Sequence, residues 1–251
     1  MATPGLLHVT ARVCNTEAVP DDLFNWFHDE EHLGAMLAGG YSDLALRYKN
    51  VDSSPNSNQY LTLYIVKDAA YLGSREHERQ IKKTMRSEIL QTDDITKLID
   101  FELTAYTKLR TYPRHGVEPR WQVETLFCLY IEPAGQPDAG LDEEWYLEHR
   151  GHMFARCKAL RRITWYLRND GVSPRFLILH ELDCKCPKDS AKEIANAIAD
   201  SSRNLVLGKS KVYIQEVYTL IGAQVRHGTA ARGFTLVRGN GIYQIVSEEM
   251  M

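Results

Sequence analysis

Residues 31–37 read EHLGAML and residues 148–154 read EHRGHMF, so one pattern, E-H-x-G-x-M-[L/F], occurs twice in the chain. A second pair of related stretches, AYTKL at residues 105–109 and VYTLI at residues 217–221, lies at a similar separation. Two matched positions in the same order indicate an internal duplication. This duplication decides the fold prediction, because whatever one half forms the other is expected to form as well.

The hydrophobic pattern predicts the same order of elements in both halves. Expected strands cover residues 6–14, 41–49, 60–67 and 101–109 in the first half, and 123–131, 162–168, 175–182 and 211–221 in the second. Expected helices cover residues 20–38, 74–90, 141–160 and 189–206. The fold class is therefore α+β, with two tandem ferredoxin-like β-α-β-β-α-β repeats.

A single ferredoxin-like unit has one bare sheet face, which would expose a large apolar surface. We therefore expect the two repeats to pack sheet to sheet as an intramolecular α+β barrel. The predicted boundaries are residues 1–113 for the first repeat and 114–226 for the second. Residues 227–251 lie outside the repeat and are expected to form an extension, as a hairpin or a lid.

The composition excludes several classes of protein. The 251 residues include 30 Lys and Arg against 33 Asp and Glu, a formal net charge of −3, which argues against a nucleic-acid partner. No apolar run approaches the roughly 20 residues of a membrane helix, and the first ten residues lack a basic, then apolar, signal pattern. Five cysteines, an odd number, fit reduced thiols. We expect a cytoplasmic protein with no membrane partner.

The doubled element order, with an aromatic residue before Glu-His on each first helix, resembles the dimeric α+β barrel superfamily. Residues 145–149, WYLEH, are similar to the EthD-like group. The resemblance covers residues 5–222 and implies one of several chemistries: polyketide cyclases, lactone isomerases, decarboxylases, cofactor-free monooxygenases and haem proteins belong to this superfamily. One relative by fold uses a histidine and a tyrosine between sheet and helices. The first half departs from the pattern, since residues 26–32 read WFHDEEH, with extra residues before Glu-His.

The second half offers a histidine at a favourable helix position. At 100° per residue, His149 lies within an apolar stripe that includes Trp145, with Tyr146 close by and His152 toward the edge. Burial makes the charged form of such a histidine harder to reach, so it suits general acid–base work near neutral pH. We predict His149 as a catalytic residue and the other three as substrate-binding residues. A core histidine bonded to a backbone carbonyl is the alternative.

Equivalent strands add further candidates. His180 shares a strand face with Phe176 and Ile178, and Tyr64 is its counterpart in the first half. We expect His180 to act beside His149, with Trp165 lining the same substrate pocket.

A second pocket is expected in the first half. It would hold His8 and Tyr64 from strands, with His32 as a further catalytic candidate and His28 as a substrate-binding one. The sequence leaves open which half carries the active site.

Metal and haem signals are weak. His28 and His32 have the i, i+4 spacing of helical zinc ligands, yet no third ligand follows them. His149 or His180 is the candidate axial ligand for a haem. We predict no cofactor and no metal.

The residues favour a cofactor-independent acid–base enzyme, of a cyclase, isomerase or decarboxylase type, acting on a small apolar oxygenated molecule. The resemblance implies that this molecule is polyketide-like or aromatic. The alternatives are a cofactor-free monooxygenase and a non-catalytic ligand-binding barrel. We expect a monomeric pseudo-dimer or a homodimer.

Overall fold

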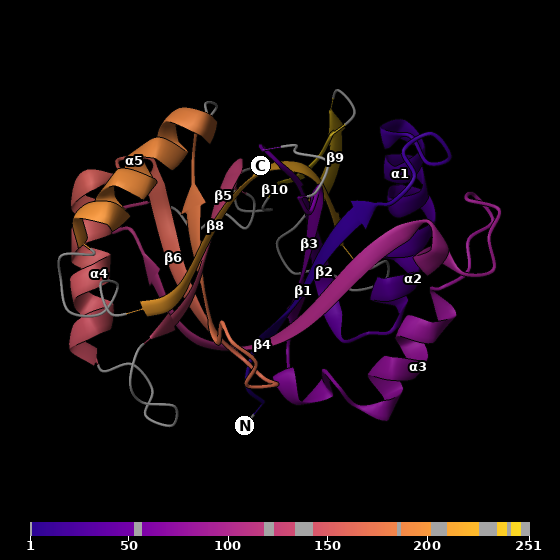
Figure 1. Ribbon diagram of the computed structural model, residues 1–251, viewed down its shortest axis with the longest axis horizontal. Helices are drawn as coiled ribbons and strands as arrows, with labels where there is room; N and C mark the ends of the chain where they lie inside the picture. Colours follow the sequence, from indigo (N-terminus) through magenta and orange to yellow (C-terminus); the bar gives the residue numbers. More distant parts are fainter. Residues whose placement is uncertain are drawn as a thin grey trace. The chain divides into compact units, whose positions relative to one another are not determined.

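The computed structural model describes residues 2–52, 57–117, 123–133, 143–184, 187–201, 210–225, 235–239 and 242–246. The chain divides into two compact units (Figure 1). Unit 1 contains residues 1–107 and 221–251, and unit 2 contains residues 108–220.

Unit 1 contains an antiparallel sheet with the strand order β4-β1-β3-β2. Its strands are β1 (Gly5–Val13), β2 (Ser42–Asn50), β3 (Tyr60–Val66) and the part of β4 (Ile99–Pro113) up to Thr107. Leu7 pairs with Tyr64 across β1 and β3, and both belong to one buried core with Leu33 and Leu37. Because side chains alternate along a strand, this register assigns the odd residues of β1 to the helix-covered face.

The first helical segment of unit 1 contains a π-turn. It runs through α1 (Asp21–Phe27), the π-helix η1 (His28–His32) and α2 (Leu33–Ala38), where the sequence predicts one continuous helix. A π-turn inserts extra residues without ending the helix, so Phe24 and Phe27 before it and Leu33 and Leu37 after it are all buried.

The second helix of unit 1 is shorter than the sequence predicts. Helix α3 (Arg75–Lys83) begins where Ser74 caps it, its Oγ accepting from the backbone N–H of His77, but it ends before residue 90. Beyond it the Glu31 carboxylate accepts hydrogen bonds from the Ser87 hydroxyl and from the backbone N–H groups of Glu88 and Ile89. These bonds satisfy backbone groups that a longer helix would have used, so tertiary contacts override the helical pattern here. Two 3-10 turns, η2 (Ala69–Tyr71) and η3 (Ile95–Lys97), flank this region.

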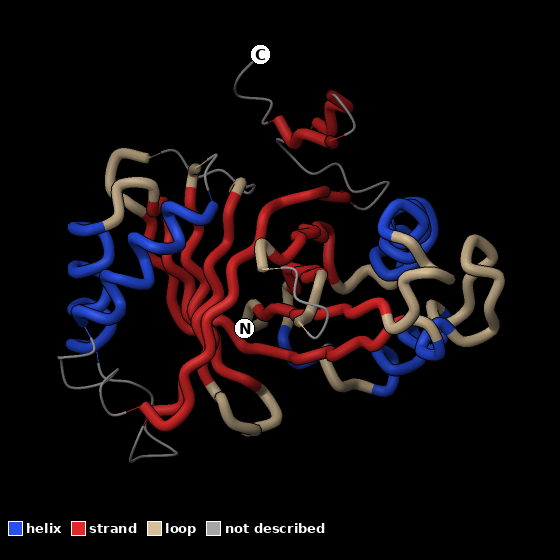
Figure 2. The backbone as a smooth tube through the Cα atoms, turned by 45° about the horizontal axis from the view of Figure 1, so that its top comes forward, coloured by secondary structure: helices blue, strands red, loops and turns tan. Residues whose placement is uncertain are grey.

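Unit 2 contains a sheet with the strand order β8-β5-β7-β6. Its strands are β5 (Thr125–Pro133), β6 (Leu160–Arg168), β7 (Phe176–Leu182) and β8 (Ser210–Val225) up to Leu220. Helices α4 (Glu143–Arg156) and α5 (Pro187–Ser201) lie along one face of this sheet (Figure 2). Met153 of α4 and Ile194 and Ile198 of α5 pack with Ile163 and Ile178 of the sheet in one core. The element order is β-α-β-β-α-β, as in unit 1.

The boundary between the units falls inside two long strands. Leu109 and Tyr112, from the end of β4, pack against the core of unit 2. Ile221, near the end of β8, packs against the core of unit 1 that contains Phe24 and Phe27. Each unit therefore contains the end of a strand that begins in the other unit.

Two short strands, β9 (Thr235–Gly239) and β10 (Ile242–Val246), pair antiparallel with Thr235 opposite Val246. In the described part of the chain, none of the helices combines the length and apolar character needed to cross a membrane.

Candidate functional site

The helix–sheet layer of unit 2 brings His149 and His180 together. His149 projects from α4 and His180 from β7, and their Nε2 atoms lie 3.0 Å apart. Both residues are buried, with 0% of the His180 surface and 4% of the His149 surface exposed. Because a neutral imidazole has one donor and one acceptor nitrogen, the two rings are complementary tautomers when both are neutral.

Aromatic rings enclose this pair. Trp165 of β6 meets the His149 ring edge to face at 5.1 Å, and Tyr146 meets Trp165 in the same way at 5.1 Å. Phe127 of β5 lies edge to face against His180 at 5.7 Å. Phe127 was not among the residues the sequence singled out, although its strand position opposite His180 is a direct consequence of the β5–β7 register.

This enclosure keeps the pair neutral at physiological pH. Burial lowers the pKa of His180 to about 3, against a small opposing effect of the Phe127 backbone. Burial also lowers the pKa of His149 well below 6.5, and the nearby His180 and His152 lower it further. The arrangement can therefore pass a proton or share a hydrogen bond without carrying a net charge.

The other second-half candidates divide into two groups. Trp165 and Tyr146 lie at the histidine pair. His152 instead contacts α5, with its Nε2 2.9 Å from the carbonyl oxygen of Ala197, so it joins the two helices rather than the pair. The side chain of Trp145 lies outside the described residues.

Unit 1 holds a second buried histidine pair, formed by His28 and His32 on the π-turn. Their ring centroids are 5.1 Å apart, and His32 stacks on Phe101 at 5.9 Å. Burial lowers the pKa of His32 to about 4. Burial, with the neighbouring Arg47 charge, lowers the pKa of His28 well below 6.5.

The expected first-half pocket does not form as a single group, because His8 and Tyr64 lie on opposite faces of the sheet. Tyr64 pairs with Leu7 and His8 with Leu63, so the pleat separates the two side chains. His8 meets Tyr106 of β4 edge to face at 5.9 Å. Tyr64 lies in the helix-covered core, where burial raises the pKa of its hydroxyl. Alternation along one strand does not determine which residues of a neighbouring strand share its face, because that depends on the register between the two strands.

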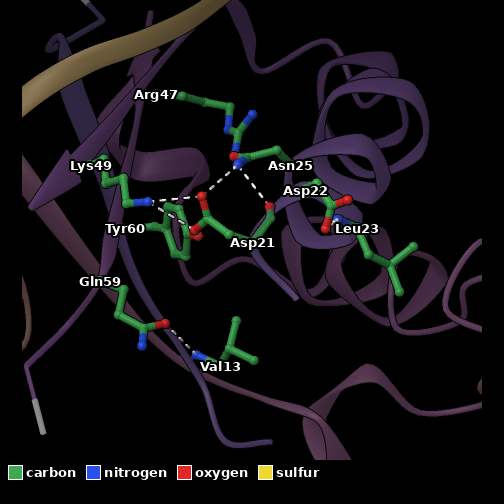
Figure 3. Close-up of polar contacts among 9 residues, drawn as sticks. All are labelled: Val13, Asp21, Asp22, Leu23, Asn25, Arg47, Lys49, Gln59 and Tyr60. Carbon is green, nitrogen blue, oxygen red and sulfur yellow. Dashed lines mark hydrogen bonds and ion pairs between the residues drawn. The ribbon is translucent and has the colours of Figure 1, made fainter. Parts of the chain in front are cut away.

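A polar network surrounds Arg47, and the sequence analysis does not predict it (Figure 3). Arg47 of β2 is 2% exposed, pairs with Asp29, and donates to Asn25 Oδ1 at 2.8 Å. Lys49, two residues on, pairs with Asp21 at 2.8 Å. The signal that was available is the four-residue spacing of Asp21, Asn25 and Asp29 on one helix face, opposite alternate residues of a strand.

Neither a metal nor a haem fits these histidines well. Among the residues that the structure describes, no three His, Cys, Asp or Glu side chains gather as a metal site requires. The Nε2 atoms of His149 and His180 are directed at each other, so neither is available in this arrangement as the axial ligand of a haem.

Comparison with known proteins places the chain by its fold. No family model and no curated protein sequence matches it. A variant of chlorite dismutase from Candidatus Nitrospira defluvii has a TM-score of 0.59 at 9% identity, covering 88% of this chain and 92% of that one. An anthrone oxidase-like protein has a TM-score of 0.50 at 12% identity, covering 92% and 96%. At such identities the likeness shows a shared fold and says nothing of the EthD-like group.

Proposed function

We propose that this protein is a cofactor-independent enzyme in which the His149–His180 pair moves a proton on a small apolar oxygenated molecule. The observation that carries the proposal is the 3.0 Å contact between the two Nε2 atoms inside an aromatic enclosure. Two neutral, mutually bonded imidazoles supply one base and one hydrogen-bond donor, the minimum for acid–base chemistry beside a carbonyl.

The step assigns a different role to each histidine. His149, the less deeply buried of the two, takes a proton from a carbon next to the substrate carbonyl. The C–H electron pair moves into the carbonyl group, and the developing oxyanion accepts a hydrogen bond from His180. The low pKa of His180 suits this role, because the ring stays a neutral donor. Each such group contributes a factor of about 10²–10⁴ to the rate. The same step begins a cyclisation, an isomerisation or a cofactor-free oxygenation, and loss of a carboxyl group in place of the proton gives a decarboxylation.

The test is deuterium exchange from D₂O into the carbon next to the carbonyl of α-tetralone, an apolar aromatic ketone. We expect the intact protein to accelerate exchange, and the variants His149→Gln and His180→Gln to lose at least a hundredfold. His115→Gln, at an exposed histidine, is the matched control and keeps the wild-type rate. Exchange at the uncatalysed rate in the wild type, or an unchanged rate in both variants, refutes the proposal. Oxygen uptake in the same sample would indicate that the reaction continues as a cofactor-free oxygenation.

One observation favours a second function, a barrel that binds a ligand without chemistry. Both rings of the pair are almost fully buried, as expected of histidines that tie a helix to a sheet. In that case the two glutamine substitutions change thermal stability while a carried ligand, seen by native mass spectrometry, stays bound.

We also propose that the two units are tandem ferredoxin-like repeats packed sheet to sheet. Support comes from the repeated E-H-x-G-x-M pattern and from the shared strand order of the two sheets. Fragments covering residues 1–113 and 114–251 are then expected to fold poorly alone and to associate when mixed. Two stable fragments that ignore each other contradict this arrangement.

A further inference from the structure

Three rings gather in unit 1 away from the histidine pair on the π-turn. Tyr41 and Tyr71 stack with centroids 5.3 Å apart and planes 11° from parallel. His77 of α3 lies edge to face against both, at 5.5 Å from Tyr41 and 5.6 Å from Tyr71. This group, the Tyr41–Tyr71–His77 cluster, is separate from every residue used in the proposed reaction.

The tautomer of His77 follows from its neighbour. The backbone N–H of Gly73 donates to Nδ1 of His77 at 3.3 Å, so Nδ1 carries the lone pair and Nε2 carries the proton of the neutral ring. The residue is 5% exposed, and Nε2 is buried with no hydrogen-bond partner among the described residues. Its N–H is therefore a donor without an acceptor.

Tyr41 presents a second unsatisfied group in the same cluster. Its side chain is 5% exposed, and its hydroxyl is buried with no hydrogen-bond partner in the described part of the chain. Buried polar groups are paired in most proteins, and an unpaired group weakens the fold. Two such donors on touching rings are unusual, and a single acceptor oxygen with two lone pairs would satisfy both.

We propose that Tyr41 and His77 form a binding site for a small molecule that presents a carbonyl oxygen from a flat apolar body. The oxygen accepts one hydrogen bond from the Tyr41 hydroxyl and one from Nε2–H of His77. The apolar body packs against Tyr71, Leu72 and Leu37, which belong to the same core cluster as Tyr41. Tyr71 is half-buried, so the cluster reaches the surface at this ring.

The test uses two probes of the same shape, acetophenone and α-methylstyrene, in which a C=CH₂ group replaces the C=O group. We expect saturable binding of acetophenone to the intact protein by calorimetry and at least tenfold weaker binding of α-methylstyrene. The Tyr41→Phe variant removes only the hydroxyl and is expected to weaken acetophenone binding about tenfold. Tyr112→Phe removes another buried hydroxyl that has no hydrogen-bond partner among the described residues, but this one lies in unit 2, so it is the matched control and leaves the affinity unchanged.

A second measurement reads His77 directly and guards against a misfolded variant. In protein labelled with ¹⁵N-histidine, acetophenone is expected to shift the Nε2 resonance of His77 while those of His149 and His180 stay in place. Without ligand, Tyr41→Phe is expected to melt at or above the wild-type temperature, since it deletes an unpaired buried group.

Three results would each overturn the site. These are equal affinity for the two probes, an equal loss of affinity in Tyr41→Phe and Tyr112→Phe, and a lower melting temperature of Tyr41→Phe. The last result would mean that the hydroxyl is already satisfied inside the fold. Absence of binding up to the solubility of acetophenone also refutes the proposal, and does so independently of the deuterium-exchange experiment.

Discussion

Nε2 of His149 and Nε2 of His180 lie 3.0 Å apart, joining α4 to the middle of the unit 2 sheet by one buried hydrogen bond. Removing either ring leaves the other a buried nitrogen without its partner. We expect His149→Leu or His180→Leu alone to lower the free energy of unfolding by about 1–3 kcal/mol. The double variant should lose less free energy of unfolding than the two single variants lose together. We expect the difference, measured by urea unfolding, to be at least about 0.5 kcal/mol. Strict additivity would show that the bond contributes nothing to the fold.

Stability is expected to fall on acidification. The folded pKa values of His32 and His180, about 4 and about 3, lie below the unfolded value of 6.5. Between these pKa values the unfolded chain binds more protons than the folded protein does. The stabilisation that comes from the two neutral histidines is therefore fully present above pH 6.5, and it declines as the pH falls toward 4 and then 3. Each histidine contributes up to about 1.4 kcal/mol per pH unit in this window. Urea midpoints at pH 7, 6 and 5 measure the slope.

The matched variants for this slope are His32→Phe and His115→Gln. The first removes a buried histidine from an aromatic cluster that accepts a phenyl ring, and should reduce the slope by close to one proton. The second removes an exposed histidine and should leave the slope unchanged. A slope that His32→Phe does not alter would contradict the low folded pKa of His32.

The buried Arg47 makes its carboxylate partner expensive to remove. Asp29→Ala leaves a guanidinium that is 2% exposed without its counter-charge, and we expect a loss of roughly 2–4 kcal/mol in thermal unfolding. The loss lies toward the lower part of the usual range for a buried ion pair because the Asp29 side chain is itself 43% exposed. Lys49→Met breaks the neighbouring exposed pair with Asp21 and should cost under about 1 kcal/mol. Equal losses would mean that burial of Arg47 is unimportant.

Two glycines should respond to alanine in opposite directions. A Cβ at Gly5 would lie 2.7 Å from the Cβ of Ala69 and 2.8 Å from the carbonyl oxygen of Tyr106, so Gly5→Ala must displace backbone and lower the melting temperature. A Cβ at Gly151, on an exposed part of α4, meets nothing within 4 Å. Gly151→Ala should therefore stabilise the protein by about 0.5–1 kcal/mol, and a loss there would contradict the described helix.

Most of the elements could be predicted from the sequence because hydrophobic periodicity reports directly on helices and strands. The exceptions have physical causes. The π-turn at residues 28–32 has no periodic signature, and α3 ends early because Glu31, distant in sequence, binds the backbone after it. The proximity of His149 and His180 followed from one helix stripe and one strand parity. The separation of His8 from Tyr64 depends on the β1–β3 register, and the unpaired donors of Tyr41 and His77 depend on side-chain packing, which the sequence does not specify.

The strands β4 and β8 also constrain how this gene can change. Leu109 lies in β4, which begins in unit 1, yet it packs with the core of unit 2. Ile221 lies in β8, which begins in unit 2, yet it packs with a core of unit 1. A substitution at either position therefore affects the packing of the unit other than the one in which its strand begins. The two units cannot change as independent modules, and a crossover that replaces one of them must bring compatible residues at both strand ends.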